Sequence, residues 1–238
     1  MSDPNPFDAD IAEIGGYVYT TNARLSSRMA NQRLTAAAEA AVDFASRRVL
    51  DIGCGDGEYT VGITRACAVR SMCGVDVNVA GLAVAQQKSG GHGIRFVAGS
   101  AEALPFRNGA FEIGQLRGVL HHLDRPAAVL QEAFRVCSTV AIIEPNGYNP
   151  VLKVLERISP YHLAHGEKSY APRRLDGWIA AAGARVTRRC WAGLVPMFCP
   201  DWMARLLKRV EPIVERVPLF NRIACAVYVA SAQRSAPE

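Results

Sequence analysis

The feature that most constrains the fold is a short apolar run that ends in three closely spaced glycines. Residues 49–57 read VLDIGCGDG, so Gly53, Gly55 and Gly57 alternate directly after the run. A run of this length is typical of a buried strand, and glycines at its end permit a tight turn and the close approach of a ligand to the backbone. We therefore predict a strand, a ligand-binding turn and a helix over 56–68.

Apolar runs and helical patterns alternate along the rest of the chain. We expect strands at 71–77, 94–99, 111–116, 139–144, 185–191 and 223–232, and helices at 23–45, 79–88, 125–136, 172–182 and 200–217. Residues 146–172 contain several prolines, glycines and histidines, and we expect them to be irregular. The alternation predicts one α/β domain with a parallel sheet and helices on both faces.

Length and composition agree with one ordinary domain. The chain has 238 residues, of which 50% are hydrophobic and 21% charged, so it can bury a sizeable core. Its seven cysteines form no CxxC pair, and no cysteine or histidine grouping has zinc spacing, so we expect no metal site. Unpaired thiols and an acidic N-terminal stretch without an apolar segment favour a cytoplasmic protein.

A carboxylate follows the second predicted strand about 20 residues after the glycines, where Rossmann-like proteins bind ribose hydroxyls. This residue is Asp76. The loop reads GxGxG rather than GxGxxG, since Glu58 stands at the place of the third glycine. Asp51, Asp56 and Glu58 would repel a pyrophosphate but suit a sulfonium and an ammonium group. The loop therefore favours S-adenosylmethionine over NAD.

Several segments together resemble one known family. VLDIGCGDGEYT is similar to the first motif of class I S-adenosylmethionine-dependent methyltransferases of the type 11-like, small-molecule kind. VDVN at 75–78, GSAEALPF at 99–106, the segment 111–136 and AIIEPN at 141–146 resemble later motifs in the same order. The resemblance implies a Rossmann-like, seven-stranded, mostly parallel sheet whose last strand is antiparallel. It also implies S-adenosyl-L-methionine as cofactor and S-adenosyl-L-homocysteine as product.

The resemblance also assigns cofactor-binding roles to ten residues. The methionine part would lie along Asp51, Gly53 and Gly55, while Asp76 would hold the ribose and Val77 would pack on the adenine. The edge of the adenine would lie near Ser100, Ala101 and Glu102. After the fourth strand, Leu116 and Arg117 would lie beside the cofactor.

Arginine is unusual for the family at position 117. A cation beside a sulfonium is unfavourable unless an anion lies nearby. The charge is also uneven. Residues 1–150 hold 13 Lys and Arg against 15 Asp and Glu, a net of −2, whereas residues 151–238 hold 14 against 7, a net of +7. Both observations lead us to expect a substrate that carries negative charge.

The catalytic residue is the least readable part of the sequence, because methyl transfer needs mainly alignment and exclusion of water. Polar side chains expected near the carboxyl edge of the sheet are the candidates: His121, His122, Tyr17, Tyr19 and His162, with Glu144 and His165 beside them. The histidines can equally be residues that pack at a helix start or lie in a solvated loop.

We expect a helical lid over 1–44 and a methyltransferase domain over 45–238, with substrate-side insertions at 144–172 and 192–222. The leading function is transfer of a methyl group to oxygen, carbon or aliphatic nitrogen of a small, anionic or partly apolar molecule. One alternative is a lipid or lipid-linked substrate at a membrane surface, with helix 200–217 on the membrane. Another is a non-catalytic partner protein that binds S-adenosylmethionine. We expect no nucleic acid, and the oligomeric state stays open.

Overall fold

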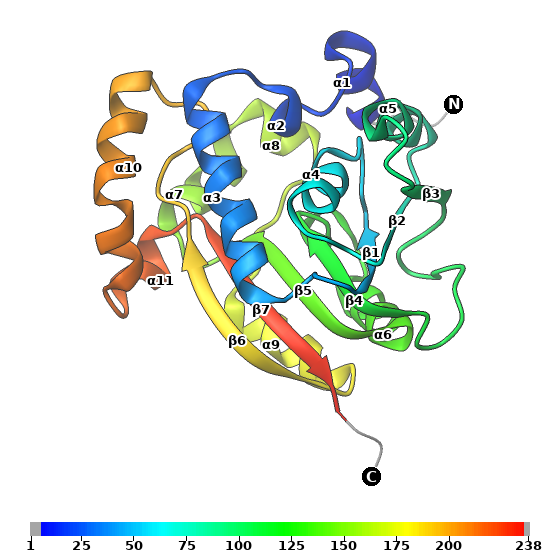
Figure 1. The fold of residues 1–238 in the computed structure, drawn as a ribbon. Coiled ribbons are helices and arrows are strands. Elements are labelled where there is room, and N and C mark those ends of the chain that lie inside the picture. Colours follow the sequence, from blue (N-terminus) through cyan, green and yellow to red (C-terminus); the bar gives the residue numbers. More distant parts are fainter. Residues whose placement is uncertain (1–5, 236–238) are drawn as a thin grey trace.

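Seven strands form one sheet in the computed structural model, which describes residues 6–235. Their order across the sheet is β3-β2-β1-β4-β5-β7-β6 (Figure 1). The strands are β1 (Arg48–Ile52), β2 (Ser71–Asp76), β3 (Arg95–Ala98), β4 (Phe111–Arg117), β5 (Cys137–Pro145), β6 (Ala184–Ala192) and β7 (Val227–Arg234). β7 runs antiparallel to both its neighbours, and the other pairs are parallel. The predicted Rossmann-like fold with an antiparallel last strand is confirmed.

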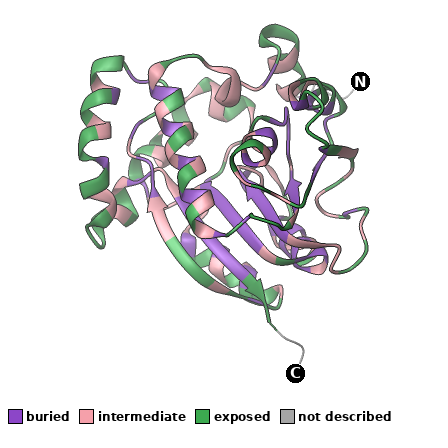
Figure 2. Ribbon diagram, viewed as in Figure 1, coloured by how far each residue is buried: buried purple, intermediate pink, exposed green. Residues whose placement is uncertain are grey.

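Alternate residues of the central strands enter two separate cores. Leu50 and Ile52 of β1 pack with α6 (Pro126–Val136) and α9 (Pro172–Ala181), whereas Val49 packs on the opposite face with α3 (Leu25–Ala41) and α4 (Glu58–Ala66). This period of two is what a strand buried on both faces requires. α5 (Val79–Ser89) contacts α4, β2 and β3 (Figure 1), and the central strands are largely buried between the helices (Figure 2).

Two expectations about local structure were wrong. The segment 146–172 is not irregular, because it contains α7 (Pro150–Ile158) and α8 (Pro160–Ala164). Asn149 starts α7 by accepting hydrogen bonds from the amides of Val151 and Leu152, and each helix has proline at its first turn. The last strand starts at Val227 rather than residue 223, because Phe220–Ala224 forms the short helix α11.

Three segments leave or cover the carboxyl edge of the sheet. The N-terminal part forms α1 (Pro6–Ile14) and α2 (Val18–Thr21), which lie above the ends of the central strands (Figure 1). α7 and α8 follow β5, and α10 (Asp201–Arg216) follows β6, which ends at the same edge as β5. The first five residues of the predicted lid lie outside the described part. Among residues 6–235, no helix has the length and apolarity needed to cross a membrane.

Candidate cofactor site and histidine cluster

The glycine loop lies where the first strand ends, and its backbone needs glycine. Gly53, Gly55 and Gly57 have φ angles of +73°, +52° and +75°, a region that side chains other than glycine rarely adopt. A Cβ on Gly53 would also stand 2.6 Å from a methyl carbon of Val119, in the loop after β4. The amide of Gly53 donates a 2.8 Å hydrogen bond to the carbonyl of Val75, which fixes the turn against β2.

Asp76 ends β2 beside this loop. Its two carboxylate oxygens accept hydrogen bonds of 2.8 Å each, one from the amide of Gly55 and one from the amide of Asn78. Burial raises the pKa of Asp76, and these hydrogen bonds oppose that rise. A carboxylate has about four acceptor sites. The amide of Val77 also forms a hydrogen bond that lowers this pKa, so about one acceptor site remains for a ribose hydroxyl, and the role of Asp76 stays a prediction.

The residues expected around the adenine lie at the same edge. Val77 follows Asp76 and is 66% exposed, so its side chain is free to pack against a ring. Ser100 is exposed and accepts a hydrogen bond from the amide of Glu102, while Ala101 and Glu102 are half-buried. The structure thus places Val77 and the 100–102 turn after neighbouring parallel strands, β2 and β3.

The three carboxylates used in the charge argument from sequence all have protein partners, which corrects that argument. Asp51 is buried and accepts hydrogen bonds from Thr60 at 2.6 Å and Gln115 at 3.3 Å. Burial raises its pKa against the effect of those bonds. Asp56 pairs with Lys88 at 2.9 Å, and Lys88 also contacts Glu58 at 3.0 Å. The fit to S-adenosylmethionine therefore depends on Asp76 and the GxGxG backbone rather than on three free carboxylates.

The two residues expected beside the cofactor after β4 lie elsewhere. Leu116 is fully buried in the core. Arg117 points to the opposite face, where its guanidinium lies 3.4 Å from the ring centre of Tyr59 and donates to the hydroxyl of Thr35 at 2.8 Å. Burial lowers the pKa of Arg117, while Tyr59 and Asp51 act in the opposite direction. Strand alternation explains both placements, and Val119 is the side chain that faces Gly53.

The N-terminal segment covers the glycine loop. The ring of Tyr17 lies so close to Gly55 that a Cβ there would overlap it. The amide of Tyr17 and the hydroxyl of Thr20 both donate to Asp56, at 3.1 and 2.6 Å. Burial and the nearby Asp76 raise the pKa of Tyr17 above its usual value, so its hydroxyl stays protonated.

A histidine cluster stands next to this covered loop. His121 and His122 belong to the short helix η1 (Leu120–His122), which directly follows Val119. Nδ1 of His121 lies 2.8 Å from Oε2 of Glu144 on β5. Burial disfavours a charged His121, but the charge and hydrogen bond of Glu144 outweigh it, so the pKa is raised. The pKa of His122 is lowered to about 3 by burial and by the charge of His121.

The catalytic candidates from distant parts of the sequence meet in this cluster. Phe7 packs 5.1 Å from the rings of Tyr17, His122 and His165. Tyr19 packs 5.1 Å from Tyr161, and burial followed by the charge of Glu167 raises its pKa. His162 contacts Glu167 at 3.2 Å.

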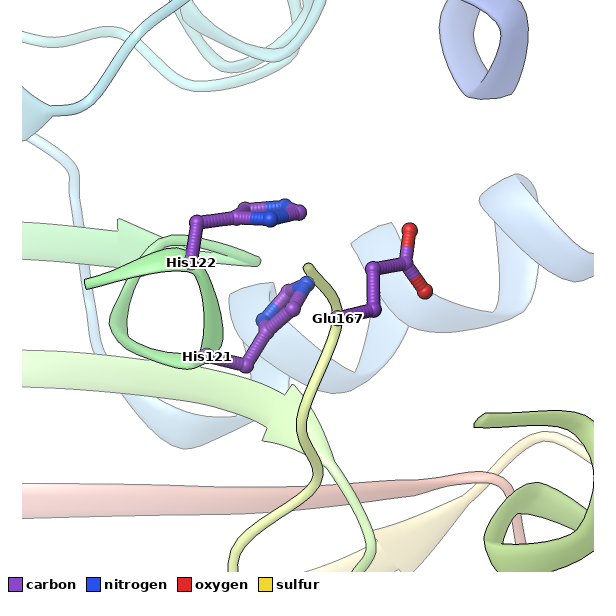
Figure 3. A group of neighbouring side chains, drawn as sticks. All are labelled: His121, His122 and Glu167. Carbon is purple, nitrogen blue, oxygen red and sulfur yellow. The ribbon is translucent and has the colours of Figure 1, made fainter. Parts of the chain in front are cut away.

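Sequence reasoning missed Glu167, whose side chain approaches both His121 and His122 (Figure 3). The spacing of His162, His165 and Glu167 along α8 and the loop after it was the available signal.

Solved structures of other proteins share this fold. A methyltransferase of Synechocystis PCC 6803 that acts on magnesium protoporphyrin IX, solved with S-adenosylhomocysteine, superposes with a TM-score of 0.63 at 14% identity, over 90% of this chain and 89% of that one. The [4+2]-cyclase SpnF superposes with a TM-score of 0.64 at 18% identity, over 91% and 85%. At these identities the likeness establishes the fold, that of class I methyltransferases and their relatives.

Sequence comparison finds similar proteins over part of the chain. Residues 50–143 match a family model described as a methyltransferase domain. This match agrees with the resemblance noted in the sequence and covers less than half of the chain. A curated phthiotriol/phenolphthiotriol dimycocerosates methyltransferase of Mycobacterium tuberculosis (strain H37Rv) is 31% identical over 111 residues, which are 46% of this chain and 38% of that protein. The chain thus covers well under half the length of this relative.

Proposed function

We propose that the protein is an S-adenosylmethionine-dependent methyltransferase that acts on oxygen, carbon or aliphatic nitrogen of a small or lipid-linked acceptor. The observation that carries this proposal is the pair formed by Asp76 and the glycine loop, joined by the hydrogen bond from the Gly55 amide. Bound S-adenosylmethionine would supply an activated methyl group. Asp76 would hold its ribose, and Val77 would pack on its adenine.

The chain's own residues serve the reaction chiefly by enclosing it. Tyr17, Phe7 and α2 cover the loop, and the aromatic side chains around Tyr19 close the edge beside it. Such a cover excludes water and aligns reactants, which is most of what methyl transfer requires. His121, held by Glu144, can bind or position an acceptor proton through its remaining nitrogen.

Calorimetry with S-adenosylhomocysteine and NAD tests the cofactor. We expect micromolar binding of the first and negligible binding of the second. Asp76→Ala should weaken binding about 10- to 100-fold, equivalent to about 1–3 kcal/mol for lost charge-assisted bonds. Asp43→Ala is the matched control, because Asp43 also accepts a backbone amide, that of Ala45, but lies exposed before β1. NAD binding without adenosylhomocysteine binding would overturn the proposal, and binding without turnover on any acceptor would favour the non-catalytic alternative.

A lipid-linked acceptor presented at an anionic membrane surface is the version that we favour for the substrate. The mycobacterial relative is named as a methyltransferase of phthiotriol and phenolphthiotriol dimycocerosates, and α10 carries an exposed apolar face. Trp202, Leu206 and Ile213 are 68%, 52% and 66% exposed. Their spacing puts them on one side of the helix, together with Val210 and Val217.

Two acidic residues of α10, Glu211 and Glu215, contact other elements of the fold, whereas Asp201 at the start of the helix is exposed. Glu211 is buried and accepts the amide of Leu194 at 2.9 Å. Glu215 pairs with Arg33 of α3 at 2.6 Å. Exposed arginines remain on the outer side, namely Arg205, Arg209 and Arg216. An outward face of apolar and cationic residues matches the chemistry of an anionic bilayer surface.

Vesicle sedimentation tests this surface. The protein should bind phosphatidylglycerol vesicles more tightly than phosphatidylcholine vesicles, and Trp202→Ser with Ile213→Ser should abolish most of the binding. Val79→Ser is the control, since Val79 is 68% exposed but lies at the start of α5. Equal binding by the double variant would contradict the proposal. Concentration-dependent self-association that the same two substitutions abolish would assign the face to a second copy of the chain instead.

A further inference from the structure

Three potential metal ligands converge beside the glycine loop, although the sequence spacing predicted no metal site. One ligand atom each from His121, His122 and Glu167 lies within 4.8 Å of the other two. The side chains come from η1 and from the loop after α8, and Figure 3 shows them as neighbours. Two ligands of one tetrahedral ion lie about 3.4 Å apart at bond lengths of about 2.0–2.2 Å. Side-chain shifts of about 1 Å therefore close the site.

Both histidines are already oriented as metal ligands usually are. Nδ1 of His121 faces Oε2 of Glu144 at 2.8 Å, and Nδ1 of His122 faces the carbonyl of His165 at 3.3 Å. Metal-binding histidines commonly use one nitrogen for such a carboxylate or carbonyl and present the other to the ion. Here that leaves Nε2 of each ring for a ligand, and the side chain of His121 is only 8% exposed.

Glu167 supplies the strongest indication of a missing partner. Its side chain is 9% exposed, and Oε2 lies 3.2 Å from Nε2 of His162. Within residues 6–235, its other oxygen, Oε1, is buried and lacks a partner at normal hydrogen-bond geometry, while the hydroxyl of Tyr19 also interacts with this carboxylate. Buried carboxylate oxygens are nearly always satisfied, so an unpartnered one among imidazoles points to a bound cation.

We propose that His121, His122 and Glu167 bind a divalent transition-metal ion of the Zn²⁺ type. Two imidazoles and one carboxylate form a donor set that such ions prefer, and they leave a coordination position open for water or an oxygen-containing acceptor. His162 then orients Glu167 from behind. The site lies next to Val119, which faces Gly53, so an acceptor held there stands beside the glycine loop. The proposal concerns binding of the ion and does not depend on methyl transfer.

Titration of the chelator-treated full chain with Co²⁺ alone tests the site by its visible absorption. We expect one ion per chain, without the near-ultraviolet sulfur charge-transfer band that coordination by a cysteine would give. Glu167→Gln and His122→Gln should each weaken Co²⁺ binding at least tenfold, and Zn²⁺ should displace the ion. His92→Gln is the control, since His92 contacts Arg65 away from the cluster.

Circular dichroism and adenosylhomocysteine binding separate loss of the metal from loss of the fold. Both should persist in Glu167→Gln, which keeps the shape of the side chain. Absence of a one-to-one Co²⁺ complex in the wild-type chain would overturn the proposal. So would a complex that Glu167→Gln and His122→Gln leave unchanged, or one with a sulfur band. Failure of adenosylhomocysteine binding would instead count against the cofactor site.

Discussion

The hydroxyl of Thr20 donates a 2.6 Å hydrogen bond to Asp56, and this bond ties the N-terminal segment to the glycine loop. Asp56 is 1% exposed and also accepts from Lys88 and from the amide of Tyr17. One buried carboxylate thus joins α2, the loop and α5. The cover over the loop is therefore held by a hydrogen-bonded charge in addition to aromatic packing.

Thr20→Val should loosen this cover without removing side-chain volume. Loss of a hydrogen bond to a charged acceptor costs about 1.5–3 kcal/mol, so residues 6–21 should exchange amide hydrogens faster and S-adenosylhomocysteine should bind about 10-fold more weakly. Hydrogen-exchange mass spectrometry and calorimetry measure the two effects. Thr21→Val is the control, because the Thr21 hydroxyl bonds only within its own helix, to the carbonyl of Tyr17. Equal effects of both substitutions would rule out a special role for Asp56.

Gly55→Ala should block the closed cover by two routes. The φ of +52° is strained for alanine, and the new methyl group would overlap the ring of Tyr17. We expect adenosylhomocysteine binding to fall more than 10-fold. Adding Tyr17→Ala should restore part of it, because the overlap then disappears while the strain remains. Gly62→Ala is the control, since a Cβ there meets no neighbour. Lack of any rescue would show that strain alone explains the loss.

Glu132 gives a prediction about pH. Hydrogen bonds from Arg135 and from the amide of Leu104 lower its pKa. A carboxylate whose folded pKa is depressed stabilises the fold above its unfolded pKa, and this contribution is lost as pH falls through the folded pKa. Glu132→Gln should therefore cost about 1 kcal/mol of unfolding free energy at pH 7 and progressively less below about pH 4.

Urea unfolding at several pH values measures this difference. Asp124→Asn is the control, because Asp124 is 96% exposed and lies 3.7 Å from Lys168, and an exposed pair of this kind contributes little. If Glu132→Gln lowers the free energy of unfolding by the same amount from pH 7 to pH 3, the charge of Glu132 is not what stabilises the fold.

The glycine loop and its partner carboxylate could be predicted from the sequence, because they depend on residues that are close together in the chain. GxGxG, Asp76 and the alternating strands needed only spacing, and the structure has them at one edge. Contacts between distant segments could not be read. Phe7 joins Tyr17 to His122, and Glu167 approaches two histidines that lie 46 and 45 residues earlier in the chain. The sequence also could not predict the burial of α10. Its periodicity indicates an apolar side, but not whether that side packs on the core or faces solvent.

Its position in the motif predicted that Arg117 would lie beside the cofactor, but the alternation of side chains along β4 directs it to the other face of the sheet. Its guanidinium stacks on Tyr59 and donates to Thr35 and to the carbonyl of Asn31, so it joins β4 to α3 and α4. It does not face the loop, and it no longer supports a negatively charged substrate. Arg117→Gln should therefore lower stability by about 2–3 kcal/mol, because it removes packing along with hydrogen bonds from a buried site.

The same substitution should leave the salt dependence of the Michaelis constant unchanged once an acceptor is known. Exposed charges act through a field that is screened beyond about 10 Å at 0.1 M salt, and Arg117 is buried at 9% exposure. Any steering of an anionic acceptor should come instead from exposed residues such as Arg205 and Arg209 on α10. Replacing these two with glutamine should raise the Michaelis constant at low salt while unfolding stays unaffected. If Arg117→Gln changes the Michaelis constant and replacement of Arg205 and Arg209 does not, Arg117 rather than α10 interacts with the acceptor.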